Sequence, residues 1–117
     1  MPSSTQPHGC RLVLSELAVR HEELISADEA TDLAYLTWQH GIATGDSRYC
    51  VLSKSFRVIA DYYEEFGVLP AASVIAAMRE IRRALPGILN AASASDGARA
   101  AALLADSVVN RVSDWPR

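Results

Sequence analysis

An all-α fold, a compact antiparallel bundle of about five helices, is predicted by the spacing of the large apolar residues. Three segments, 52–66, 74–85 and 101–115, place such residues three or four positions apart. This spacing lines one face of an α-helix. Because each segment has an apolar face to bury, we expect the helices to pack on one another.

The length of 117 residues predicts a single domain with its own core. We expect residues 1–9 to form a disordered arm, because they are rich in proline, serine and glycine, and residues 10–117 to form one helical domain. The predicted core is Leu14, Leu17, Leu24, Leu33, Leu52, Phe56, Ile59, Phe66, Met78, Ile81, Leu85, Leu104, Val108 and Val112.

A capping box separates the first two helices. The first is expected over residues 10–25. In the following Ser26-Ala27-Asp28-Glu29, the Ser26 hydroxyl can accept from the Glu29 N–H, and the Glu29 carboxylate can accept from the Ser26 N–H. The second helix is therefore expected over residues 27–40, ending before Gly41.

The third helix is expected after a loop over residues 42–46. Asp46 or Ser47 can cap its start, and it runs to Phe66. Its first turns, residues 48–52, contain several residues that favour β-structure, so a short strand is an open alternative there.

Proline and polar residues delimit the last two helices. The fourth is expected over residues 70–85, since Pro86 disfavours helical backbone in the residue before it. After a loop, Ser95 or Asp96 is expected to cap a fifth helix that continues to about residue 114.

Composition narrows the possible functions. The net charge of −3 disfavours a general nucleic-acid binder. No apolar run is long enough for a membrane span. The two cysteines, Cys10 and Cys50, have no metal-site spacing and are typical of a reducing compartment. We therefore expect a cytoplasmic protein. The abundance of Ala, and of Arg relative to Lys, suggests a bacterial or phage genome.

Surplus aromatic and acidic residues suggest a surface for another protein. Tyr35 and Trp38 share a face of the second helix distinct from its inner face, and adjacent Tyr62 and Tyr63 are not expected to face the same core. Tyr and Trp are enriched at protein interfaces. We expect Tyr35, Trp38, Tyr62, Glu22 and Glu23 to contact a partner, either a protein with a basic surface or a second copy in a homodimer.

Two alternative functions remain open. Arg79, Arg82 and Arg83 form a basic edge of the fourth helix, which could serve a DNA-binding regulator or an acidic partner; pairing with acids of the preceding helix is the simpler interpretation. Glu29 and Asp32 have an ExxD spacing that could serve a divalent-metal-dependent hydrolase, although no companion motif lies on a separate element.

No catalytic or cofactor motif occurs in the sequence. His21 lies on the inner stripe of the first helix, where it is either a core histidine or a functional group. The leading hypothesis is a small cytoplasmic regulator or inhibitor that binds another protein and performs no catalysis, of the adaptor, antitoxin, immunity or phage anti-defence type.

Overall fold

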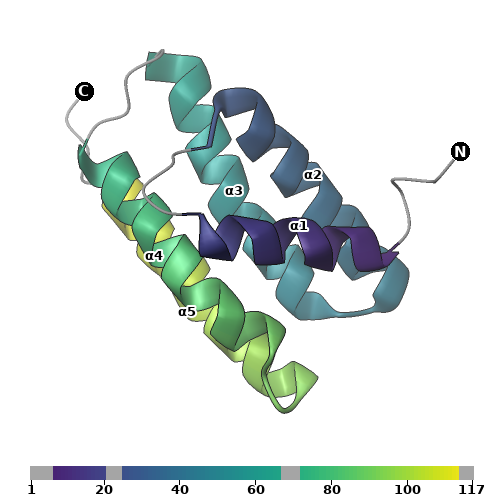
Figure 1. Cartoon of the computed structure of the whole chain (residues 1–117). Coiled ribbons are helices and arrows are strands. Elements are labelled where there is room, and N and C mark those ends of the chain that lie inside the picture. The colour runs from purple at the N-terminus through teal and green to yellow at the C-terminus, as the bar shows by residue number, and fades with distance from the viewer. Residues whose placement is uncertain (1–6, 21–24, 67–71, 114–117) are drawn as a thin grey trace, which may run out of the picture.

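Five α-helices contain most of the residues that the computed structural model describes, which are 7–20, 25–66 and 72–113. They are α1 (Pro7–Val19), α2 (Ala27–Thr44), α3 (Ser47–Phe66), α4 (Ala72–Leu89) and α5 (Ala94–Ser113). In Figure 1, α2 and α3 lie side by side as one hairpin, α4 packs along α5 as a second, and α1 crosses over them. The all-α prediction is confirmed.

The core is centred on α3, which packs mainly against α2 and α5. Every predicted core residue whose side chain is described is buried: Leu14, Leu17, Leu33, Leu52, Phe56, Ile59, Met78, Ile81, Leu85, Leu104 and Val108. Leu24 and the side chains of Phe66 and Val112 lie outside the described part. Residues 48–52 are helical, so the strand alternative is wrong.

Two-sided packing also buries both Tyr62 and Tyr63, which are 9% and 8% exposed. Their rings meet edge to face, with centroids 6.4 Å apart. The prediction that only one of them faces the core is therefore wrong. A helix covered by neighbours on two sides buries a wider arc than one stripe, so adjacent residues can both be inside.

The predicted cap of α2 is present at Ser26. Its backbone is extended, and its hydroxyl accepts a hydrogen bond from the Glu29 N–H at 3.1 Å. The Glu29 carboxylate, expected to return to the Ser26 N–H, accepts from Arg20 Nη1 at 3.0 Å. This half of the capping box is replaced by an ion pair between the end of α1 and the start of α2.

We expect Ser26→Ala to lower the free energy of unfolding by about 0.5–2 kcal/mol, because a backbone donor in the first turn of α2 loses its acceptor. Urea denaturation measures this change, and Ser26→Asp, which restores a side-chain oxygen, should recover most of it. Unchanged stability in Ser26→Ala would show that α2 does not depend on the cap.

α2 continues past Gly41, so its predicted end is wrong. Gly41 is buried inside the helix, and a Cβ built there would lie 2.5 Å from Cys50 Sγ and 2.9 Å from Cys50 N. Glycine is therefore needed at this position for the close approach of α2 and α3. The helix ends at Gly45, whose φ of 71° is the left-handed conformation of a helix C-cap.

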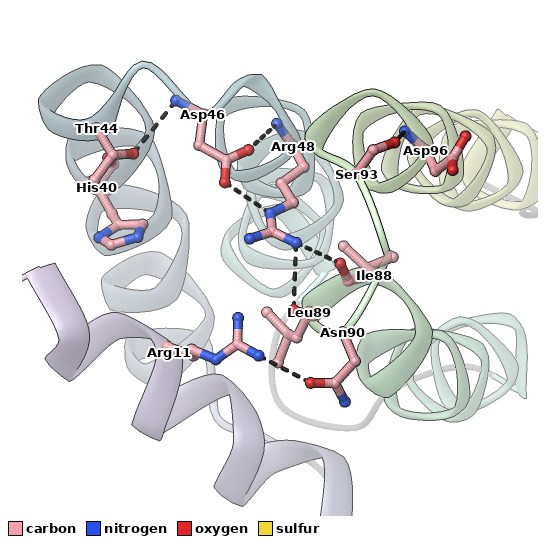
Figure 2. Close-up of polar contacts among 10 residues, drawn as sticks. All are labelled: Arg11, His40, Thr44, Asp46, Arg48, Ile88, Leu89, Asn90, Ser93 and Asp96. Carbon is pink, nitrogen blue, oxygen red and sulfur yellow. Dashed lines mark hydrogen bonds and ion pairs between the residues drawn. The ribbon is translucent and has the colours of Figure 1, made fainter.

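α4 contains Pro86, which the sequence places beyond its end. Pro86 removes one helical hydrogen bond, at a cost of about 3 kcal/mol. The turn after it is held by tertiary contacts: Ile88 and Leu89 are buried, and Arg48 Nη1 donates to their carbonyl oxygens at 2.8 and 3.3 Å. Figure 2 shows the Arg48 guanidinium reaching from α3 to this end of α4.

The remaining boundaries also shift. α1 begins at Pro7, inside the predicted arm, and ends at Val19, before the predicted residue 25. α5 is capped by Ser93, whose hydroxyl accepts from the Asp96 N–H at 3.1 Å, and Ser95 and Asp96 lie inside the helix. Asp96 occupies the first turn, where a negative charge is favourable.

Candidate functional site

A groove of about 510 Å³ lies between the outer faces of α2 and α3. Because the two helices are antiparallel and joined by the short turn at Gly45 and Asp46, their outer faces lie side by side along the hairpin. We call this the aromatic groove. It is lined by Thr31, Ala34, Tyr35 and Trp38 of α2 and by Ser53, Arg57, Ala60, Asp61 and Glu64 of α3.

The aromatic side of the groove is formed by Tyr35 and Trp38, which are 62% and 50% exposed. Both lie opposite the inner face of α2, where Leu33 and Thr37 are buried. Gln39 Nε2 donates to Tyr35 Oη at 2.9 Å. This bond joins residues one helical turn apart and limits the motion of the phenol ring. The predicted exposure of Tyr35 and Trp38 is therefore confirmed.

Ile42 extends this apolar face and is not among the residues predicted from the sequence. It is 62% exposed and lies seven residues after Tyr35, which places both on one face of α2. The spacing of Tyr35, Trp38 and Ile42 was the signal that could have found it. It was overlooked because α2 was expected to end at His40.

The α3 side of the groove carries charge. Arg57, Asp61 and Glu64 are exposed, and none of them forms an ion pair or side-chain hydrogen bond with a described residue. Ser53 uses its hydroxyl to donate to the carbonyl of Cys50 at 2.7 Å. The three charged side chains are therefore available to a ligand without the loss of an existing contact.

Of the other predicted partner-binding residues, Tyr62 is buried and lies outside the groove. Because neighbouring helices cover it, Tyr62 offers little surface to a partner in this fold. Glu22 and Glu23 lie outside the described residues, as does His21.

The predicted basic edge of α4 is reduced to two exposed arginines. Arg79 and Arg83 are exposed, whereas Arg82 is only 7% exposed and donates from Nη1 to the Arg20 carbonyl at 3.0 Å. Arg82 therefore helps to hold α4 against the end of α1. The sequence could not show that Arg82 is buried. Residues at i, i+3 and i+4 span an arc of the helix surface, and one edge of that arc can face the core.

Acidic and sulfur-containing side chains form no metal site among residues 7–20, 25–66 and 72–113, where no three of the histidine, cysteine, aspartate and glutamate residues cluster suitably. Glu29 pairs with Arg20, while Asp28 and Asp32 are exposed. Cys10 is buried, and burial raises the pKa of its thiol to about 11. Its thiol is therefore protonated at neutral pH and poorly nucleophilic.

His40 is packed edge-on against Tyr49, with ring centroids 4.2 Å apart, and its Nδ1 is buried with no hydrogen-bond partner among the described residues. Burial lowers the pKa of His40, an effect that Asp46 opposes and Arg48 reinforces. The neutral imidazole is therefore favoured. Because α2 continues to Thr44, His40 does not occupy the helix end at which the sequence places it.

The comparisons with known proteins add no relative. The chain matches no protein family, and no similar protein is found among curated sequences or solved structures. In the described ranges, none of the helices combines the length and the apolar character that crossing a membrane would require.

Proposed function

We propose that this chain is a small cytoplasmic regulator or inhibitor that binds another protein through the aromatic groove and performs no catalysis. The observation that supports the proposal most directly is the exposed stripe of Tyr35, Trp38 and Ile42 beside the groove. Isolated exposed apolar residues are ordinary, but adjacent large ones next to a concave surface are typical of an interaction site.

The chemistry of the stripe suits protein binding. Tyr and Trp combine a large apolar surface with a hydrogen-bonding group and lose little conformational entropy when they are fixed in an interface. The Tyr35 phenol is already oriented by Gln39, which lowers the cost of ordering it. Arg57, Asp61 and Glu64 supply a polar rim on the opposite wall.

The proposal predicts that a double variant, Tyr35→Ala/Trp38→Ala, loses the partner. The wild-type chain, immobilised through its amino terminus, is used to capture proteins from an extract of the organism that encodes it. Because central aromatic contacts of this kind dominate binding energy, we expect the amount of partner captured by the double variant to fall about tenfold or more. Affinity is then measured with the purified partner.

The matched control is Leu12→Ala/Leu103→Ala, which removes two exposed apolar side chains from α1 and α5. Circular dichroism should show unchanged folding in both double variants, since all four positions are exposed. Equal loss of the partner in the control, or full retention in Tyr35→Ala/Trp38→Ala, would contradict the proposal.

A second copy of the chain is the alternative binding partner for the aromatic stripe. Light scattering at micromolar concentrations tests it directly against the monomer mass of 12.7 kDa. A doubled mass that Tyr35→Ala/Trp38→Ala returns to the monomer value would assign the groove to a homodimer. A constant monomer mass would exclude the homodimer.

A further inference from the structure

The aromatic groove has one acidic end. The first two turns of α2 lie beside the last two turns of α3, because the helices are antiparallel neighbours (Figure 1). All exposed charged residues on these four turns are acidic: Asp28, Asp32, Asp61, Glu64 and Glu65. Asp61 and Glu64 line the groove, and neither forms an ion pair with a described residue.

At the other end of the groove the α2 side is apolar, whereas the α3 side carries Ser53 and, next to it, the exposed Lys54. Trp38 lies one turn closer to the α2–α3 connection than Tyr35, and Ile42 lies a further turn along. The basic lining residue, Arg57, is on the middle turn of α3, between Ser53 and Asp61. A ligand lying along the groove therefore meets carboxylates at one end and large apolar side chains at the other.

We propose that the groove binds an amphipathic helix of a partner protein that carries lysine or arginine at one end and apolar residues along the rest of its contact face. This proposal rests on the proposed function and names the chemistry of the partner. A helix laid between two helices presents apolar residues at i, i+3, i+4 and i+7 to a groove of this kind. Asp61 and Glu64 then pair with its basic end.

The dimensions set the length of the bound helix. The outermost lining residues of α3, Ser53 and Glu64, are eleven residues apart, which is about 17 Å at the rise of an α-helix. A partner helix of about three turns covers this length. Its basic residues fall within one turn of one end, because the acidic residues lie on the terminal turns of α2 and α3.

Charge complementarity disfavours a second copy as the occupant. In a two-fold symmetric dimer each copy brings the same surface of α2 and α3, on which five exposed acids outnumber the two exposed cations, Lys54 and Arg57. Two surfaces of the same net charge would then face each other, which is unfavourable. A basic helix removes this penalty, and a nucleic acid would bring phosphates against the same carboxylates.

The test uses a display library of 16-residue helical peptides with leucine fixed at i, i+3, i+4 and i+7 and with random charged residues at both ends. It is selected against the full chain and counter-selected against Tyr35→Ala/Trp38→Ala. Affinities of the enriched peptides are measured by fluorescence anisotropy on the wild type, on Asp61→Asn/Glu64→Gln and on the control Asp106→Asn. Asp106 is an exposed acid of α5, away from the groove.

We expect enriched peptides to carry lysine or arginine at one end. Asp61→Asn/Glu64→Gln should weaken their binding about threefold to tenfold at low salt, as two partly exposed ion pairs do. This difference should shrink in 0.5 M salt, where exposed charges are screened. Asp106→Asn should bind as the wild type does.

Four results would overturn the inference: no enriched peptide, enrichment without a basic end, equal binding to Asp61→Asn/Glu64→Gln, or a dimer that Tyr35→Ala/Trp38→Ala dissociates. The basic-helix inference and the proposed function can be distinguished experimentally. A captured partner that needs Tyr35 and Trp38 but is unaffected by Asp61→Asn/Glu64→Gln would leave the proposed function standing and refute the basic helix.

Discussion

Phe56→Ala is expected to lower the free energy of unfolding by about 3–5 kcal/mol, the usual cost of truncating a fully buried phenylalanine. Phe56 has no exposed surface and lies on α3 between Leu52 and Ile59, both of which are also completely buried. Because α3 packs against both α2 and α5, the cavity left by the ring would lie inside the main core. This loss is a large part of the total stability of a domain of this size.

The measurement is urea denaturation followed by circular dichroism, with Leu103→Ala as the control. Leu103 is 68% exposed on α5, so its truncation should change stability by about 0.5 kcal/mol or less. Phe56→Leu should give a smaller loss than Phe56→Ala, because more of the volume is retained. A midpoint for Phe56→Ala close to that of the wild type would mean that α3 is rotated relative to the packing described above.

Arg48→Met is expected to lower the free energy of unfolding by about 2–4 kcal/mol, because it breaks a mostly buried ion pair and removes charged hydrogen bonds. Arg48 Nε donates to Asp46 Oδ2 at 2.8 Å, and the side chains are 14% and 17% exposed. Its guanidinium also lies 5.1 Å from the centre of the Tyr49 ring. The same group donates to the last turn of α4, as Figure 2 shows.

Arg57→Met is the matched control, since Arg57 is an exposed arginine of the same helix and should tolerate the change within about 0.5 kcal/mol. Arg48→Lys should give an intermediate loss of stability. Lysine keeps the charge but lacks the planar guanidinium, which donates to Asp46 and to the carbonyls of α4 at the same time. If Arg48→Met and Arg57→Met were equally stable, Arg48 would not be the residue that holds the turn after Pro86.

The fold class and the central helix were determined by the sequence alone, since they depend on local spacing. The stripe from Leu52 to Tyr63 requires a helix of one phase, and its described members are buried as that phase predicts. The start of α2 is equally local, because Ser26 and the Glu29 N–H are separated by three residues in any helix that begins there.

Predictions from local sequence were wrong for residues whose conformation depends on a contact with a distant part of the chain. Gly41 and Pro86 both indicate helix ends by their intrinsic preferences, yet both lie inside helices. Gly41 is required by the backbone of α3, and the turn after Pro86 is stabilised by Arg48, forty residues earlier in the chain. Arg82 and Tyr62 are buried for a similar reason, because neighbouring helices cover more of α3 and α4 than one stripe.

The candidate site divides in the same way. The exposure of Tyr35 and Trp38 follows from their position opposite Leu33 and Thr37 on one helix, so the sequence could predict it. The groove and its acidic end could not be predicted, because Asp61 and Glu64 come near Thr31 only when α2 and α3 pack antiparallel. Spacing along the chain determines which face of a helix a residue occupies, and only packing determines what lies opposite that face.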